Sequence, residues 1–130
     1  MIVLDASAVV EWLLRTPAGQ RIHQRVMSHP KSLHAPQLLD VEVLHVLRRL
    51  VHRGAVLPDR AELAVQDLLD IRITRHPLFG FVPRIWQLRN NLSAYDAAYV
   101  ALAEGLGATL LTRDARLASA PVHAAAIELF

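Results

Sequence analysis

Four carboxylates of this sequence stand in unusually apolar surroundings. Asp5 follows Ile-Val-Leu, Glu42 lies in QLLDVEVLHVLRRL, and Asp96 and Asp114 flank the stretch AAYVALAEGLGATLLTR. If these acids converge, two like charges about 4 Å apart repel by roughly 4 kcal/mol at an effective dielectric constant of about 20. Such a cluster requires a bound cation or raised pKa values. Carboxylate oxygens without cysteine or paired histidine ligands suit Mg²⁺, with Mn²⁺ as the alternative ion.

Three of the four acids also have a structural explanation. Asp5 could cap a helix that begins after it, and Asp114 could be the N-cap of a helix from Ala115. Ser93 and Asp96 match the Ser/Thr-x-x-Asp/Glu capping box, in which the acid belongs to the cap. All three explanations put carboxylates at helix starts beside strand ends, which form one edge of a parallel sheet.

The fourth acid, Glu42, lies in a helical pattern of its own. At about 100° per residue, Glu42, His45 and Arg49 form a narrow polar stripe on a helix that is otherwise mostly leucine and valine. Such a stripe on a buried helix could line a cleft. The alternative is a solvated edge on which Glu42 and Arg49 pair two turns apart. Asp40 points into the apolar arc near the helix start, where it complements the helix dipole, and is a secondary candidate for the site.

Hydrophobic periodicity and breaker residues predict alternating strands and helices. Thr16-Pro17 reads as an N-cap and first helical residue, Asp59 and Glu62 as a capping box, and Gly54 as a helix stop. This alternation, without two-residue hairpin turns, predicts an α/β fold with a parallel sheet and helices on both faces. Asp5 and Asp114 then fall just past strand ends, where sheets of this class bind ligands. The expected strands are 2–4, a short one within 29–36, 71–74, 108–112 and one near 127, and the expected helices are 7–14, 17–28, 37–52, 59–70, 84–90, 93–105 and one from 115.

Length and composition predict one domain over residues 1–130. The hydrophobic fraction of 53% argues against disorder. No apolar run approaches the roughly 18 residues of a membrane span, and the start lacks the basic region of a signal peptide. With no cysteine in the chain, we expect a cytoplasmic protein without membrane contact. The net charge of +2 is too small to indicate nucleic-acid binding by itself, although thirteen of the fourteen basic residues are arginine.

Several other chemistries are missing from the sequence. The Gly105-x-Gly107 pair follows a helix instead of a strand and lacks the third glycine of a phosphate loop. Haloacid-type phosphatases need a second aspartate where this chain has Ser7. HExxH and Gly-x-Ser-x-Gly motifs are absent. The seven histidines show no ligand spacing, and His23 and His29 read as surface residues.

The motifs, taken together, resemble those of a known family. IVLDASAVV, the Glu42 helix in APQLLDVEVLHVLRRL, SAYDAAYVALAEGLGA and LLTRDARL occur in the order and spacing of PIN-domain ribonucleases. The chain most resembles the VapC toxins of type II toxin–antitoxin systems, over residues 1 to about 119. The resemblance implies a three-layer α/β/α sandwich around a mainly parallel sheet. Ser7 and Thr112 match positions that support the site by hydrogen bonding, whereas His45 stands where many relatives carry asparagine.

The resemblance also implies a function. Asp5, Glu42, Asp96 and Asp114 match the family's acidic quartet, and the activity it implies is divalent-metal-dependent endoribonuclease cleavage of RNA. Our hypothesis is that Asp5 and Asp96 are the main Mg²⁺ ligands, that Asp114 completes the site, and that Glu42 orients or deprotonates the attacking water. The family implies a cognate VapB-like antitoxin, and usually a homodimer, for which the helical surfaces near Trp12 and Leu63 are candidates.

Two rival hypotheses remain from the sequence. A flavodoxin-like ligand-binding domain would explain the alternation and Asp5, but not Glu42 or Asp114. A catalytically silent α/β module that only binds RNA or a protein partner would keep the fold and lose the chemistry. Metal affinity without cleavage would identify the silent module.

Overall fold

The computed structural model describes residues 1–28, 31–121 and 123–130. Its five strands form one sheet in the order β3-β2-β1-β4-β5, and every neighbouring pair is parallel. Val3, in the central strand, is opposite His34 on one side and Leu110 on the other. The predicted parallel sheet is therefore confirmed. The strands are β1 (Ile2–Leu4), β2 (Leu33–Pro36), β3 (Ile73–His76), β4 (Thr109–Thr112) and β5 (Ala126–Leu129).

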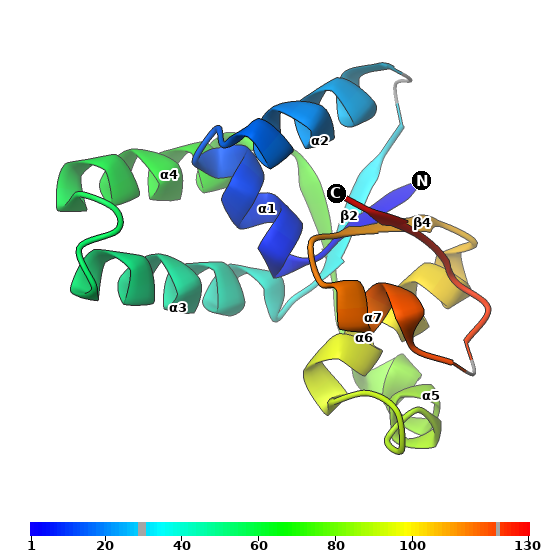
Figure 1. Cartoon of the computed structure of the whole chain (residues 1–130). Helices are drawn as coiled ribbons and strands as arrows, with labels where there is room; N and C mark the ends of the chain where they lie inside the picture. Colours follow the sequence, from blue (N-terminus) through cyan, green and yellow to red (C-terminus); the bar gives the residue numbers. More distant parts are fainter. Residues whose placement is uncertain (29–30, 122) are drawn as a thin grey trace.

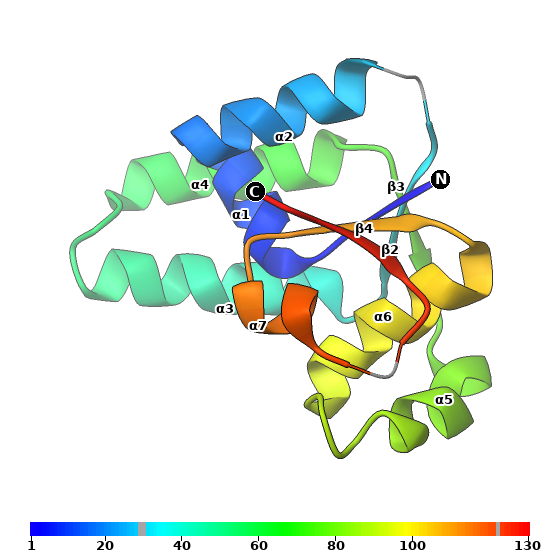
Figure 2. The same cartoon turned by 45° about the vertical axis from the view of Figure 1, so that its right-hand side comes forward.

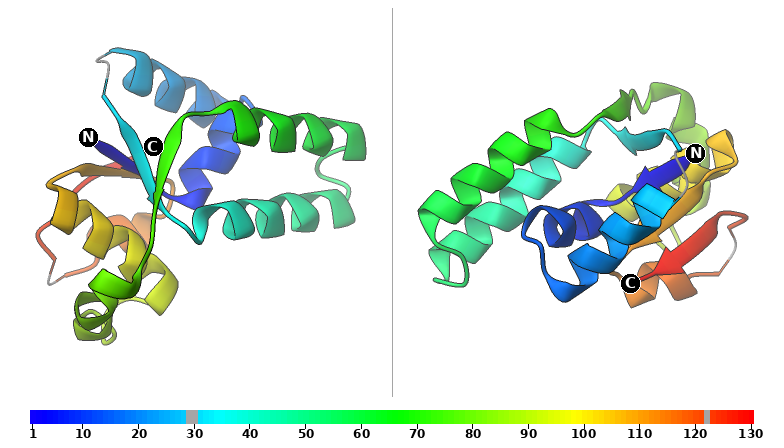
Figure 3. Two further views of the ribbon diagram at one scale, coloured as in Figure 1. Left: turned by 180° about the vertical axis from the view of Figure 1, so that it is seen from behind. Right: turned by 90° about the horizontal axis from the view of Figure 1, so that it is seen from above.

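Helices cover both faces of this sheet, which confirms the three-layer α/β/α arrangement (Figures 1 and 2). Helix α1 packs against the sheet with α2 over it, and α6, backed by α5, covers the opposite face. Helices α3 and α4 form a hairpin that projects to one side (Figure 3). The helices are α1 (Ala6–Leu13), α2 (Pro17–Ser28), α3 (Leu39–His52), α4 (Pro58–Asp70), the short 3₁₀ helix η1 (Phe79–Phe81), α5 (Val82–Gln87), α6 (Ala94–Leu106) and α7 (Ala115–Ser119).

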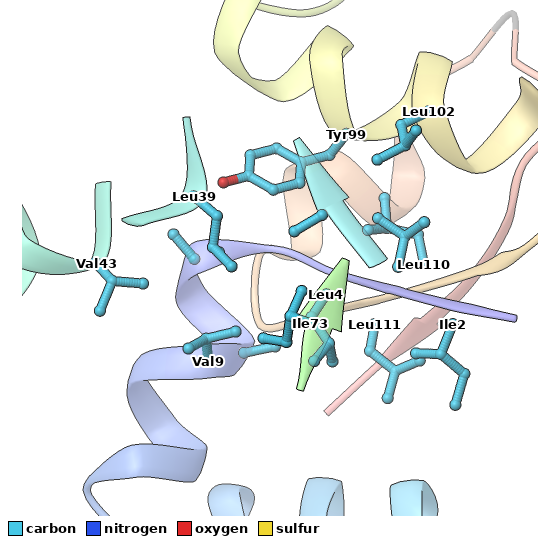
Figure 4. Close-up of a cluster of buried hydrophobic side chains, with 14 of the residues drawn as sticks. Ile2, Leu4, Val9, Leu39, Val43, Ile73, Tyr99, Leu102, Leu110 and Leu111 are labelled. Carbon is cyan, nitrogen blue, oxygen red and sulfur yellow. The ribbon is translucent and has the colours of Figure 1, made fainter. Parts of the chain in front are cut away.

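The core lies on both sides of the central strands. Every residue of β1 is buried, although successive side chains of a strand point to opposite faces. Figure 4 shows Ile2 and Leu111 on the side of α1, and Leu110 with Leu102 and Tyr99 on the side of α6. Both faces of a parallel sheet must be covered in this way, because both carry apolar side chains.

Helix α6 is built to lie close to the sheet. Its buried residues include four alanines, so little side-chain bulk separates its backbone from β1, β2 and β4. The helix ends at Gly107, which has a positive φ of 59° and donates its amide to Glu104. Glycine adopts this left-handed conformation without the steric cost that a side chain would add. This close fit fixes the start of α6, and with it Asp96, relative to the strands.

Some predicted details are wrong. Helix α4 begins at Pro58 after Leu57, without a side-chain cap, so Asp59 and Glu62 do not form a capping box. Strand β3 begins at Ile73 instead of 71, because Ile71 is the C-cap of α4, with its amide donating to the Asp67 carbonyl, and because pairing with β2 starts only at Ile73. The predicted strand within 29–36 is β2, while residues 29–30, including the predicted surface residue His29, lie outside the described residues.

The strand order creates a switch point beside β1. This strand has β2 on one side and β4 on the other, so the chain leaves β1 and β4 toward opposite sides of the sheet. Ligands of open α/β sheets bind in the crevice beyond the carboxyl ends of strands at such a point.

No helix within the described residues is long and apolar enough to span a bilayer.

Candidate active site

Asp5 is the buried centre of the candidate site, directly after β1. Its side chain is held at the switch point, and the residue is only 6% exposed. One oxygen, Oδ1, accepts hydrogen bonds from the Ser7 hydroxyl at 2.7 Å and from the Ala8 amide at 2.8 Å. The other, Oδ2, accepts a hydrogen bond from the Thr112 hydroxyl at the end of β4. Asp5 therefore caps α1, as one hypothesis predicted, and also lies where the site hypothesis requires it.

Two hydroxyls brace the turn after β4 against the turn after β1. The Ser7 hydroxyl, besides donating to Asp5, accepts the Arg113 amide at 2.9 Å. The Thr112 hydroxyl also donates to Asp5 and accepts the Asp114 amide at 2.9 Å. Thr112 is fully buried, so this exchange fixes the position of the segment that carries Asp114.

Glu42 approaches the same place from the first turns of α3. Its Oε1 accepts a hydrogen bond of 3.2 Å from the Tyr99 hydroxyl of α6. Among the described residues Glu42 forms no ion pair with Arg49, so the predicted pairing across two turns is wrong. The helix is also not a buried rod, because only Leu39, Val43 and Leu47 are buried. Glu42 lies half-buried at the border of this single apolar stripe.

Asp96 lies in the first turn of α6, half-buried. The Ser93 hydroxyl caps the helix by accepting the Asp96 amide at 3.2 Å. Ser93 therefore caps α6, as the capping-box pattern predicted, and a side-chain hydrogen bond from Ser93 also lowers the pKa of the Asp96 carboxyl.

Asp114 is the N-cap of α7, as the capping hypothesis predicted. Its Oδ1 accepts the backbone amides of Arg116 at 2.9 Å and Leu117 at 3.4 Å. Its Oδ2 accepts the Arg116 guanidinium at 3.1 Å. Burial alone would raise the pKa of the Asp114 carboxyl, but these hydrogen bonds lower it below its usual value.

The remaining three acids show the electrostatics of a shared site. Burial raises the pKa of Asp5, and the charge of Asp96 raises it further. Burial likewise raises the pKa of Glu42, with added repulsion from Asp96 and Asp5. The pKa of Asp96 is raised by burial and then by Asp114. The fold thus gathers Asp5, Glu42 and Asp96. Asp114 lies on the Asp96 side and forms an ion pair with Arg116.

Two other residues considered from the sequence lie outside this cluster. Asp40 forms a two-pronged ion pair with Arg75 of β3, at 2.8 and 3.1 Å, and therefore has a structural partner. His45 is exposed. Sequence reasoning missed the contact between His34 and His76, whose ring nitrogens are 2.8 Å apart. No sequence spacing indicates that pair, because the two residues lie on different strands.

The donor set fits a hard divalent cation. Its three acids offer carboxylate oxygens, and the described residues include no arginine or lysine that forms an ion pair with Asp5, Glu42 or Asp96. No three His, Asp or Glu side chains in the described part of the chain surround a common point closely enough to hold a metal as they stand. Mg²⁺ is commonly held by one or two carboxylates and keeps several waters. Asp5 and Asp96 could supply the two carboxylates.

Comparisons with known proteins identify the family of this chain. The PIN domain family model matches residues 2–122. Ribonuclease VapC12 of Mycobacterium tuberculosis is 45% identical over 129 residues, which are 99% of this chain and 98% of the relative. Ribonuclease VapC9 of the same organism is 44% identical over 117 residues, covering 90% of this chain and 88% of the relative.

Solved structures have the same fold. The crystal structure of PAE2754 from Pyrobaculum aerophilum superposes with a TM-score of 0.70 and 25% identity, over 97% of this chain and 81% of that one. VapBC2 from Rickettsia felis, bound to a DNA fragment from its promoter, gives a TM-score of 0.70 at 13% identity, over 99% and 98% of the two chains. This chain therefore belongs to the PIN-domain family and, within it, to the VapC ribonucleases.

Proposed function

We propose that this chain is a divalent-metal-dependent endoribonuclease that hydrolyses RNA phosphodiester bonds and acts as the toxin of a toxin–antitoxin pair. The observation that carries the proposal is the cluster of Asp5, Glu42 and Asp96, three carboxylates of raised pKa brought from separate elements to the switch point of the sheet. Acids that repel one another, and that form no ion pair with arginine or lysine within the described residues, are suited to bind a cation and, through it, a phosphate.

The four acids have different roles in this proposal. Asp5 and Asp96 would hold Mg²⁺ or Mn²⁺, because Asp5 is buried directly after β1 and the charge of Asp96, in the first turn of α6, adds to the rise in the pKa of Asp5. Asp114 would complete the site from its rim, since its carboxylate already forms an ion pair with Arg116 at 3.1 Å. When bound, the cation supplies positive charge that lowers the pKa of water and offsets charge on the phosphorane.

Glu42 would act as the general base. Its carboxylate is half-buried, and burial raises its pKa toward neutral pH. A general base works best when its pKa is near the working pH, because it is then ionised and still able to accept a proton. It would orient the attacking water and take its proton as the water attacks phosphorus in line. The bond between phosphorus and O3′ would break, and the departing O3′ would take a proton from solvent water. The products would be a 5′-phosphate and a 3′-hydroxyl, so the preference for RNA must come from the shape of the groove or from contacts to the 2′-hydroxyl.

The partners follow from the same proposal. The substrate is RNA, and the cytoplasm is the expected location. A VapB-like antitoxin would bind this chain. This expectation is supported by the similar solved structures of VapBC2 from Rickettsia felis and of FitAB, each bound to a DNA fragment. The helical surfaces near Trp12 and Leu63 stay candidates for a homodimer interface. Residues 1–130 would form one nuclease domain.

Cleavage assays on end-labelled RNA test the proposal. Purified protein should cut RNA with Mg²⁺ and stop when EDTA is added, and Asp5→Asn should lose the activity. Asp40→Asn is the matched control, because Asp40 is bound to Arg75 outside the cluster and should retain near-normal cleavage. Mn²⁺ binding without any RNA cleavage by the unmodified protein would instead identify a catalytically silent binding module.

A further inference from the structure

Tyr99 makes a contact with Glu42 that the roles above do not use. Its hydroxyl donates to Glu42 Oε1 at 3.2 Å, across 57 positions of sequence. Figure 4 shows the hydroxyl pointing from α6 toward the first turn of α3, where Leu39 lies. In the described part of the chain no other group donates a hydrogen bond to the Glu42 side chain. The orientation of Glu42 therefore depends on this one donor.

The Tyr99 donor is buried in the core, whereas the Glu42 acceptor is only half-buried. Tyr99 is only 2% exposed and belongs to the hydrophobic core. Glu42 is half-buried on a long side chain, and the charges of Asp96 and Asp5 repel it. Without a donor on the inner side, that repulsion would turn the carboxylate outward to solvent. A fixed hydroxyl on the inner side opposes the turn.

The same helix carries a proposed metal ligand. Asp96 lies three residues before Tyr99, so both side chains are on one face of α6. Because burial and the charges of Glu42, Asp5 and Asp96 raise the pKa of Tyr99, its hydroxyl stays protonated and remains a donor. One rigid helix therefore sets two groups at once: Asp96 directly, and Glu42 through Tyr99.

We propose that Tyr99 is a positioning residue for RNA cleavage, whose hydroxyl holds the Glu42 carboxylate turned inward toward the water that attacks the phosphate. This inference rests on the proposed nuclease function and on the role of Glu42 within it. Tyr99 itself touches neither the substrate nor the cation in this scheme.

Steady-state cleavage by Tyr99→Phe tests the proposal. Phenylalanine keeps the ring in the core and removes only the hydroxyl, so kcat should fall about tenfold while KM changes less than about twofold. Loss of one hydrogen bond should shift the melting temperature by less than about 5 °C. Tyr95→Phe is the matched control, because Tyr95 is on the same helix, is 65% exposed and should keep the wild-type kcat.

Mn²⁺ binding, measured by electron paramagnetic resonance, separates positioning from a merely structural role. Tyr99→Phe should bind Mn²⁺ within about twofold of the wild type, since Asp5 and Asp96 are unchanged. A loss of Mn²⁺ affinity, or a large fall in melting temperature, would mean that the hydroxyl maintains α6 itself and would overturn the inference. A wild-type kcat in Tyr99→Phe would overturn the inference about Tyr99 but leave the proposed function standing. RNA left uncut by the wild-type protein would overturn both.

Discussion

At the scale of single residues, the site is defined by carboxylates that are costly to ionise. Asp5 has hydrogen-bond donors on both oxygens, yet burial still raises its pKa. Glu42 and Asp96 are less buried, and each feels the charge of another acid. Burial and mutual repulsion of these carboxylates therefore cost stability in the folded, metal-free protein when they are ionised. In the proposed function a bound cation would compensate this cost.

Asp96→Asn should separate function from stability. The amide keeps the shape of the side chain and removes one charge, so cleavage should fall by about a hundredfold or more if the carboxylate binds the cation. Without metal, the free energy of unfolding should rise or stay within about 0.5 kcal/mol, because repulsion is relieved. Cleavage assays and urea melts in EDTA measure the two effects. Full activity would remove Asp96 from the site, and a large loss of stability would favour a capping role.

The raised pKa values also predict a pH dependence of stability. A carboxyl whose pKa is higher in the folded than in the unfolded state binds its proton more tightly when folded. Its contribution to stability is therefore present at low pH and falls as pH rises through the unfolded value of about 4 toward the higher folded value. Because of the Asp5–Glu42–Asp96 cluster, the free energy of unfolding of the metal-free protein should fall as the pH is raised from about 4.5 to about 7.

Urea melts in EDTA at these two pH values test this prediction. Asp96→Asn should lose less stability than the wild type over the interval, because one member of the cluster no longer ionises. Asp40→Asn should keep the wild-type difference, since Asp40 is paired with Arg75. Equal pH differences in the wild type and in Asp96→Asn would contradict the mutual repulsion.

At the scale of elements, the site depends on the ends of β1 and β4 being fixed to each other. Parallel pairing brings Leu4 opposite Leu111, so the residues that follow each strand leave the sheet side by side. The Ser7 and Thr112 hydroxyls then connect the two turns through Asp5 and the amides of Arg113 and Asp114. The turns are consequently rigid where the acids must be accurately placed.

Thr112→Val should reveal the strength of this connection. Valine has nearly the same shape but leaves the Asp114 amide and one oxygen of Asp5 without their partner, so the free energy of unfolding should fall by about 1–3 kcal/mol. Thr109→Val, at the start of the same strand, is the control and should change stability by less than about 0.5 kcal/mol. Chemical denaturation measures both, and an equal effect of the two substitutions would show that the brace contributes nothing particular.

At the scale of the whole molecule, the cluster connects segments from distant parts of the chain. Residues of β1, α3, α6 and the β4–α7 turn meet only when both helical layers are packed on the sheet. A cation bound there would interact with the folded state alone, because the unfolded chain does not bring Asp5 and Asp96 together. Cation binding should therefore stabilise the complete fold.

Melting curves with and without metal should show this coupling. Mg²⁺ or Mn²⁺ at about a hundredfold excess over its Kd adds roughly 2.7 kcal/mol to the stability of the wild type, or about 10 °C in melting temperature. EDTA should reverse the shift, and Asp96→Asn should show little of it. A metal-induced shift of equal size in Asp96→Asn would place the binding site elsewhere.

Much of the fold and the position of the site could be predicted from local sequence. A short apolar run ending at Asp5, the Ser93 cap and Gly107 are signals that act within a few residues, and the corresponding elements are present. Other features were mispredicted because they depend on partners elsewhere. The start of β3 is set by pairing with β2, and α3 buries one stripe although leucine and valine occur around most of its surface.

The sequence by itself determined the alternation of strands and helices, and hence a parallel sheet with acids at its carboxyl edge. Those outcomes follow from periodicity, caps and strand ends, which are local. Only the tertiary structure decided that Asp40 pairs with Arg75 and that the Tyr99 hydroxyl donates to Glu42. Both contacts join side chains from separate elements, so their geometry exists only once the layers have packed around the sheet, whereas the contact of Asp114 with Arg116 is local to the start of α7.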